Sequence, residues 1–305
     1  MNIYENNCKK EILNKIQLQK DYNHYSLGKT LYAASAKGNR KKQEDSVLIL
    51  NHPQKEEFCM IAVSDGVGGF LGGDIASNHV VYRLIYWFES LDKDLYTNMQ
   101  KVEESLEYML DTVFDDLKIK YDIETTLSAA IIGENETLIA NIGDSRIYTV
   151  QNNILKQETR DDSEVQELLE DEVIVDKELM RFSHGSNELN RALSNIYKDE
   201  INYKVINNTY DKIIATSDGV TDCLSHKELE NIINQAKQDE IANDIINSAL
   251  TNNSNINDII KSLPKHKKKL VEEIEERIKE DYYQTIEGGK DSACVAVYVR
   301  KWIKK

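Results

Sequence analysis

The stretch FCMIAVSDGVGGFLGGDIAS, residues Phe58–Ser77, decides the fold of this chain. Its opening apolar run predicts a buried strand, and the run ends at a carboxylate, Asp65. Glycines follow from Gly66 onward, and they allow a tight turn in which a backbone carbonyl comes close to a bound ion. The turn leads into a helical pattern whose apolar face consists of Val80, Leu84, Trp87, Phe88 and Leu91. A strand that places a carboxylate on a glycine-rich turn is typical of a metal or phosphate site.

Short strand-like runs lie on both sides of this stretch. Residues 30–63 contain TLYAASA, SVLIL and FCMIAV, and the runs TLSAAIIG, ETLIANIG and RIYTV follow a second helical pattern. The GENE turn predicts a hairpin between TLSAAIIG and ETLIANIG, and INYKVI with DKIIATS predicts another antiparallel pair. Helical patterns then precede a final strand, SACVAVYV. Grouped strands and grouped helices predict an α+β fold, a β-sandwich flanked by helices.

The composition argues against several classes of function. The 305 residues are 40% hydrophobic with 13 Gly and 2 Pro, which is typical of a folded globular chain. The 38 Lys and Arg residues against 53 Asp and Glu give a formal net charge of −15, which argues against nucleic-acid binding. Four scattered cysteines argue against a zinc knuckle or a disulfide framework. Because no segment is apolar enough for a signal or a membrane span, we expect a cytoplasmic protein without a membrane partner.

Acidic residues recur at the ends of the predicted strands. They are Asp65 after FCMIAVS, Asp144 after TLIANIG, Asp218 after KIIATS and Asp291 before SACVAVYV. Strand ends can converge in space, and hard divalent cations such as Mg²⁺ and Mn²⁺ prefer oxygen ligands, so we infer a shared metal site. The plainer alternative is that each aspartate caps a turn or a helix, which requires the same coincidence four times.

Two phosphate-binding motifs are matched only in part. The glycine-rich turn departs from GxGxxG because Leu71 stands at its last position, and Asp65 at its entrance would repel a pyrophosphate. The sequence GKT at 28–30 copies the end of a P-loop, but Asn23 occupies the position of the leading glycine. The chain has neither a GxSxG elbow nor a HExxH pair, so serine hydrolases and zinc proteases are not indicated.

Eight segments, taken in order, resemble the motifs of the metal-dependent protein phosphatases of type 2C, the PPM family, in their bacterial form. They are GNRKKQED, SDGVGGFLGGDIAS, ETTLSAAI, NIGDSRIY, TRDDSEV, NELNRALS, ATSDGVTDCLS and GGKDSACVAVYV. The resemblance extends from about Thr30 to the C-terminus. It implies a four-layer α/β/β/α sandwich of two mainly antiparallel sheets. It also implies a Ser/Thr phosphatase in which water activated by a binuclear Mn²⁺ or Mg²⁺ centre attacks phosphoserine or phosphothreonine directly.

The resemblance assigns residues to this site one by one. Asp65 resembles the carboxylate that bridges both metals, and Gly66 resembles the residue that gives one of them a backbone carbonyl. Asp218 and Asp291 resemble the ligands of the other metal. Arg40 resembles the guanidinium that binds the substrate phosphate, for which its planar fork suits bidentate contact. Arg40 and Asp65 are therefore the expected catalytic residues.

Further acids match positions around these ligands. Glu44 and Asp45 resemble the pair that contacts metal-bound water, and Asp144 and Asp222 resemble the ligands of a third metal found in some members. Ser292 replaces a usual Asn, and the His within or after the Asp-Gly-x-Gly-Gly motif is missing, so protonation of the leaving group is unassigned. These departures leave a second hypothesis open, a pseudophosphatase that binds phosphoproteins or serves as a scaffold.

The expected domain organisation follows from the extent of the match. We expect an N-terminal helical extension over 1–28 and the phosphatase domain over 29–305. Within the domain, residues 159–194 occupy the place of the family's flap, and residues 238–285 form an additional helical segment. The expected partner is a phosphorylated protein, the substrate of a Ser/Thr kinase, and we expect the chain to be a monomer.

Overall fold

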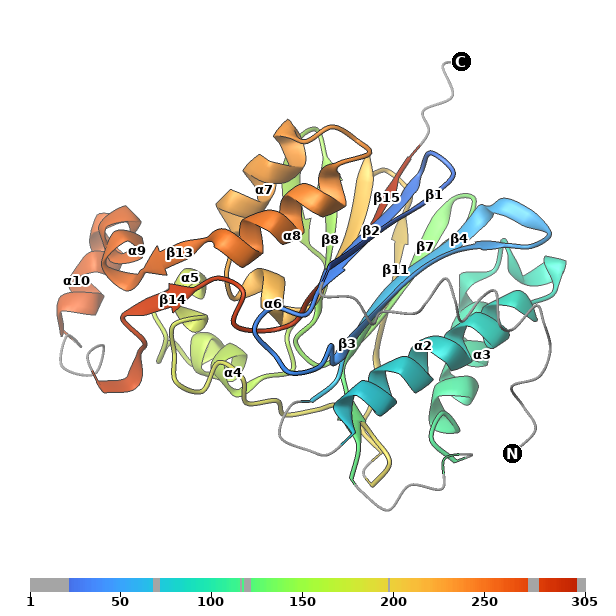
Figure 1. The fold of residues 1–305 in the computed structure, drawn as a ribbon, viewed down its shortest axis with the longest axis horizontal. Helices are drawn as coiled ribbons and strands as arrows, with labels where there is room; N and C mark the ends of the chain where they lie inside the picture. The colour runs from blue at the N-terminus through green and yellow to red at the C-terminus, as the bar shows by residue number, and fades with distance from the viewer. Residues whose placement is uncertain are drawn as a thin grey trace.

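Two stacked antiparallel sheets form the centre of the molecule (Figure 1). The computed structural model describes residues 22–67, 72–115, 117, 122–196, 198–273 and 280–300. In spatial order the six-stranded sheet contains β1 (Tyr22–Leu27), β2 (Leu31–Ala36), β15 (Ala293–Val299), β12 (Lys212–Thr216), β8 (Arg146–Gln151) and β9 (Ile154–Gln157). The five-stranded sheet contains β11 (Asn202–Asn207), β7 (Glu136–Ile142), β6 (Leu127–Ile132), β4 (Lys55–Asp65) and β3 (Asp45–His52).

Helices cover the outer face of each sheet. On the five-stranded sheet lie α2 (Gly73–Glu89) and α3 (Met99–Asp111), joined by the short helix η1 (Lys93–Leu95). On the six-stranded sheet lie α7 (His226–Gln235) and α8 (Ile241–Thr251), preceded by the one-turn helix α6 (Asp218–Thr221). Apolar cores fill the space between the sheets and beneath each helical layer. The predicted four-layer α/β/β/α sandwich is confirmed (Figure 1).

Strand β4 is buried on both faces, which explains why the apolar run at its centre is uninterrupted. Alternate side chains enter the core between the sheets, namely Cys59, Ile61 and Val63. The remaining side chains pack beneath the helices α2 and α3, namely Phe58, Met60 and Ala62. Because successive side chains of a strand point to opposite faces, a strand buried on both faces needs apolar residues at every position.

Three expectations about secondary structure are resolved by the strand pairing. The GENE hairpin is confirmed, since the N–H of Gly133 donates to the carbonyl of Glu136 at 2.9 Å between β6 and β7. The expected pairing of INYKVI with DKIIATS is wrong, because β11 pairs with β7 in one sheet and β12 pairs with β8 and β15 in the other. Strand β11 is a half-exposed edge strand, whereas β12 is buried in mid-sheet. The helical extension does not reach residue 28, because β1 occupies the end of that range; residues 1–21 lie outside the described residues.

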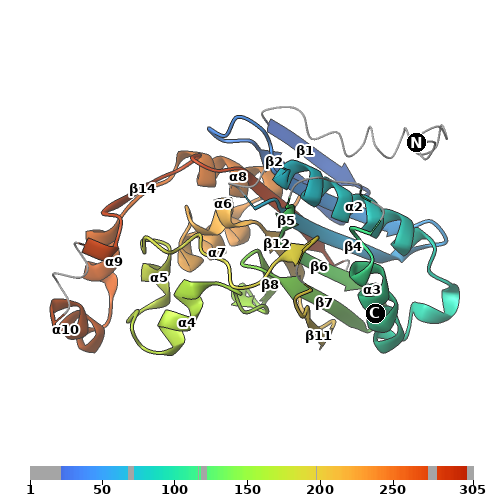
Figure 2. The same ribbon diagram turned by 90° about the horizontal axis from the view of Figure 1, so that it is seen from below.

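A smaller body, which we call the side lobe, lies at one end of the sandwich (Figure 2). It consists of α4 (Glu164–Glu170), α5 (Lys177–Met180), α9 (Ile256–Ser262), α10 (Lys265–Glu273) and the antiparallel pair of β13 (Asn253–Asn255) with β14 (Thr285–Glu287). The flap and the additional helical segment therefore share one apolar core. A two-stranded sheet of β5 (Glu124–Thr125) and β10 (Leu193–Ser194) marks the return of the flap to the sandwich.

Candidate metal centre

The strand ends bring the predicted acids to one end of the sandwich. Asp45 and Asp65 are directly opposite each other in the β3–β4 register. Asp218 opens α6 immediately after β12, and Asp291 lies two residues before β15, the neighbour of β12. A cavity of about 130 Å³ lies where these segments meet, and Asp144 reaches it from the turn between β7 and β8. Its lining includes Arg40, Glu44, Asp65, Gly66, Asp144, Asp218 and Asp291.

Burial and mutual repulsion dominate the electrostatics of this cluster. Burial, followed by the charge of neighbouring carboxylates, raises the pKa of Asp65, Asp144 and Asp218 above the ordinary value of an aspartate. Burial and the charge of Asp218 likewise raise the pKa of Asp45 to about 8, against a bond from the Ser217 hydroxyl at 2.7 Å. The cluster therefore retains protons near neutral pH unless cations compensate its charge.

The donor atoms suit hard divalent cations. Oδ1 of Asp218 is buried and has no hydrogen-bond partner among the described residues, as expected of an oxygen reserved for an ion. The carboxylates are not arranged as a ligand shell, however, and no three His, Cys, Asp or Glu side chains in the described ranges are placed to hold one ion. Asp65 and Asp218 are hydrogen-bonded to each other, and Asp291 is paired with Arg40. The chemistry of the site thus fits the cations, whereas ion binding requires these side chains to turn.

Arg40 lines the cavity, and its positive charge is paired with two carboxylates. Its guanidinium forms an ion pair with Asp291 and a second contact of 3.5 Å with Glu44. The hydrogen bond to Asp291 raises the pKa of Arg40 above its ordinary value, so the side chain is a cation throughout the physiological range. Its side chain is 39% exposed, which leaves the guanidinium within reach of a ligand that enters from solvent.

Two glycines allow the close backbone approaches on which this end of the sandwich depends. A Cβ on Gly66 would lie 2.2 Å from the carbonyl oxygen of Gly73, and a Cβ on Gly219 would lie 1.8 Å from that of Ser292. The N–H of Gly66 also donates to the carbonyl of Glu44 at 3.1 Å. Any side chain at these positions would push apart the segments that carry Asp65 and Asp218.

The outer acids occupy two different positions. Asp45 is 2% exposed and lies behind the cavity, bonded to Ser217, while Glu44 lines the cavity itself. Asp144 lines the main cavity and also a smaller one beside it, which contains Asp222. The structure thus brings together the acids that the sequence singled out. Asp222 lines only the smaller, neighbouring cavity.

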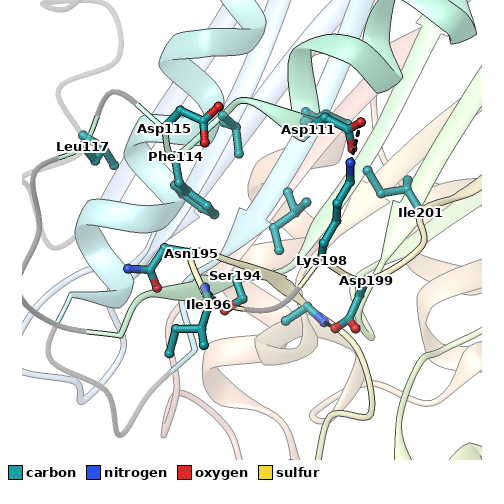
Figure 3. A pocket seen from close by; sticks show the side chains of 14 residues that line it. Asp111, Phe114, Asp115, Leu117, Ser194, Asn195, Ile196, Lys198, Asp199 and Ile201 are labelled. Atoms are coloured by element: carbon teal, nitrogen blue, oxygen red, sulfur yellow. Dashed lines mark hydrogen bonds and ion pairs between the residues drawn. The ribbon is translucent and has the colours of Figure 1, made fainter.

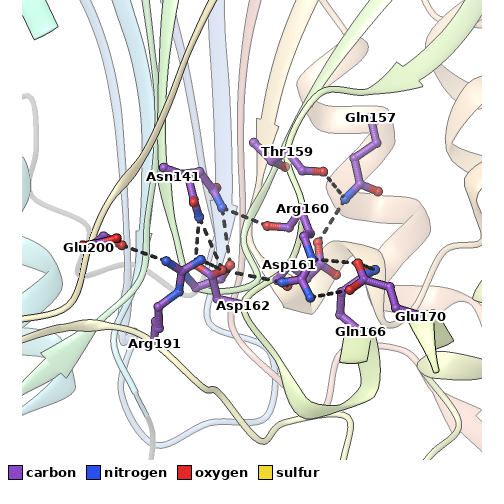
Figure 4. A network of polar contacts seen from close by, with 12 residues as sticks. Asn141, Gln157, Thr159, Arg160, Asp161, Asp162, Gln166, Glu170, Arg191 and Glu200 are labelled. Atoms are coloured by element: carbon purple, nitrogen blue, oxygen red, sulfur yellow. Dashed lines mark hydrogen bonds and ion pairs between the residues drawn. The ribbon is translucent and has the colours of Figure 1, made fainter. Parts of the chain in front are cut away.

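Several residues of the site were not assigned from the sequence. Arg146 donates from Nε to both carboxylate oxygens of Asp161, at 3.0 and 2.9 Å, and from Nη2 to one of them at 2.6 Å. The neighbouring Asp162 accepts from the N–H of Gly143 at 3.1 Å and pairs with Arg191 at the far end of the flap (Figure 4). These contacts hold both sides of the turn that carries Asp144. Arg146 belongs to the motif GDSR, and Asp161 and Asp162 belong to the motif TRDD, but the sequence does not show that these residues contact each other.

The flap also contributes to the main cavity, through Asn187 and Leu189 of the NELNRALS motif. A larger groove of about 420 Å³ lies elsewhere, between the end of α3 and residues 192–201 (Figure 3). An ion pair of 2.8 Å between Lys198 and Asp111 crosses it, and none of the clustered carboxylates lines it. Among the described residues, no helix has the length and apolar character that crossing a bilayer requires.

Comparisons with known proteins agree with this geometry. The family model described as "Protein phosphatase 2C" matches residues 34–252. Serine/threonine phosphatase stp of Listeria monocytogenes serotype 4b is 33% identical over 189 residues, which cover 59% of this chain and 73% of the relative. Protein phosphatase PhpP of Streptococcus pneumoniae is 30% identical over 207 residues, 64% and 80% of the two chains. The crystal structure of the PstP catalytic domain with two manganese ions superposes with a TM-score of 0.62 at 22% identity, covering 91% of this chain and 97% of that one. The chain belongs to the protein phosphatase 2C family.

Proposed function

We propose that this chain is a metal-dependent protein Ser/Thr phosphatase that hydrolyses phosphoserine and phosphothreonine by direct attack of water. The observation that carries the proposal is the single cavity lined by Arg40, by Glu44 and by aspartates from four separate segments. Two Mn²⁺ or Mg²⁺ ions, when bound, would lower the pKa of a water molecule and offset charge on the phosphoryl oxygens. The names of the relatives support phosphoproteins as substrates.

The carboxylates would hold the ions and fix their position. We assign Asp65, Asp218 and Asp291 as ligands, with the backbone carbonyl of Gly66, because all four residues line the cavity. Burial and repulsion raise the pKa of Asp65 and of Asp218, and divalent cations would remove the repulsion. Asp45 is a positioning residue, since it is buried behind Asp65.

Arg40 would bind the phosphate of the substrate. Its present partners are Asp291 and Glu44, so the guanidinium competes with the ions for Asp291. Once Asp291 turns to an ion, the planar fork of Arg40 is released for a bidentate contact with phosphate oxygens. Ion binding and phosphate binding would therefore favour each other.

A second candidate is the pseudophosphatase, a phosphoprotein-binding module without turnover. It is suggested by the missing His within or after the Asp-Gly-x-Gly-Gly motif. It is also favoured by Ser292, whose buried hydroxyl has no hydrogen-bond partner among the described residues. For either candidate we propose a cytoplasmic monomer whose partners are proteins phosphorylated by a Ser/Thr kinase.

Turnover of p-nitrophenyl phosphate and of a phosphothreonine peptide separates the two candidates. We expect hydrolysis that requires Mn²⁺ or Mg²⁺ and stops with chelator. Asp65→Asn should reduce kcat by more than about 100-fold, because losing a ligand should exceed the effect of losing a supporting residue. Asp239→Asn, at an exposed turn, is the matched control and should retain wild-type turnover. Equal rates for the wild type with Mn²⁺, the wild type with chelator and Asp65→Asn would instead support the binding module.

A further inference from the structure

The small cavity beside the metal centre contains a buried arginine that the proposed reaction does not use. Arg181 follows helix α5 in the flap and is 7% exposed. Its Nη1 donates to the carbonyls of Asp222 at 3.2 Å and Cys223 at 3.0 Å, and these two residues directly follow α6. Its Nε and Nη2 are buried and have no hydrogen-bond partner among the described residues. Buried guanidinium donors without partners are costly, so these two atoms indicate a missing contact.

The missing contact lies in a very small space. Arg181 lines a cavity of about 10 Å³ together with Asp144, Asp218 and Asp222. The hydroxyl of Ser163, on the same cavity, is also buried without a partner in the described part of the chain. A space of this size accommodates about one water molecule. A divalent ion that keeps several of its waters would not fit unless the arginine moved.

The charges around this cavity are already partly balanced by protein groups. Arg146 is bonded through two nitrogens to Asp161, which neutralises that carboxylate. Arg146 and Arg181 both line the cavity together with Asp144 and Asp222. A cation bound between Asp144 and Asp222 would lie beside the guanidinium groups of Arg146 and Arg181, which repel it.

We propose that Arg181 takes the place of a third divalent cation, so that this chain binds two ions and not three. The guanidinium acts as a built-in counter-charge for Asp222 and Asp144, and one water molecule links its free donors to these carboxylates. This inference rests on the proposed function, because it assumes the two ions at Asp65, Asp218 and Asp291.

The location of Arg181 also ties the flap to the metal centre. Its neighbours Met180 and Phe182 are buried in the core of the side lobe, and the guanidinium lies 5.0 Å from the centre of the Phe182 ring. Arg181 is therefore a positioning residue between the side lobe and the acids, with no contact to the reacting phosphate in this assignment.

Counting bound Mn²⁺ in the full chain tests the proposal. Equilibrium dialysis with metal analysis, over rising Mn²⁺ concentration, should give two ions per chain for the wild type. Arg181→Met removes the charge at similar length and should gain a third, weaker ion, and adding Asp222→Asn should remove it again. Arg181→Lys keeps the charge and should bind two ions. Arg160→Met is the matched control, because Arg160 lies in the same flap with its side chain 44% exposed and paired to Glu170, and it should also bind two.

The outcomes separate this inference from the proposed function. Three ions in the wild type would overturn the inference whatever the variants do, and so would a count of two in an Arg181→Met protein with a native circular dichroism spectrum. If Arg181→Met does not fold, Asp222→Asn in the wild-type background decides, since we expect no loss of bound Mn²⁺ and a loss would contradict us. Metal-independent turnover, or no bound ion in the wild type, would overturn the proposed function itself.

Discussion

The sandwich, which carries the acids, and the side lobe, which includes much of the flap, are stabilised by different kinds of core. The sandwich has a core between its sheets and one beneath each helical layer, and its strands come from distant parts of the chain. The side lobe has a single core made by short helices of two segments. Backbone contacts join these segments, including a bond of 2.6 Å from the N–H of Tyr283 to the carbonyl of Phe182, and Lys267 pairs with Asp176 at 2.7 Å. The acids therefore lie on the sandwich, whereas Arg181, which lies beside them, is held by the side lobe.

The largest effect on stability is expected from the core between the sheets. Ile61 is fully buried there, so Ile61→Ala should reduce the free energy of unfolding by about 2–5 kcal/mol. Urea denaturation followed by circular dichroism measures this change. Ile154→Ala, at a position 67% exposed on the edge strand β9, should change stability by less than about 0.5 kcal/mol. Similar losses in the two variants would contradict the central role of this core.

A pH-dependent effect should be confined to the acidic end of the sandwich. The folded protein keeps a proton on Asp45, whose pKa is about 8 through burial and the charge of Asp218, whereas the unfolded chain releases it near its ordinary value of 3.8. Stability without divalent ions should therefore fall as pH rises from about 4 to about 8, because the folded state binds more protons across this window. Thermal melts in chelator should show the fall, and saturating Mn²⁺ should reduce it. A melting temperature that rises with pH in chelator would contradict the assignment.

The smallest global effect is expected from the side lobe. Phe182→Ala removes a fully buried ring, yet the loss should appear as local opening, because the lobe has its own core. Hydrogen exchange should accelerate in α4, α5 and α9 while the strands of the sandwich stay protected. Hydrolysis of p-nitrophenyl phosphate should persist, and KM for a phosphopeptide should rise. Leu270→Ala, at a position 46% exposed on α10, is the control without effect. Global unfolding as large as that of Ile61→Ala would show that the two bodies are one cooperative unit.

Local sequence patterns were sufficient to predict the helices and strands and the positions of most of the acids in the cluster. Asp65, Asp144 and Asp218 follow strand-like runs, and strand ends meet at one edge of a sandwich, so their convergence was predictable. The choice of partner strands was not, because β11 and β12 are neighbours in sequence yet belong to different sheets. The role of Arg181 was also hidden, since a lone arginine in a polar segment resembles a solvated surface residue. Its burial depends on a core completed by a segment far along the chain.

The shared core of the side lobe has a consequence for synthesis of the chain. Phe182 leaves the ribosome about a hundred residues before Tyr282, one of the side chains that bury it. At ordinary translation speeds that interval is about 5–20 s. During this time the flap's apolar side chains lack the part of their core that residues 256–286 supply. Synthesis of that later segment is then the event that completes the core.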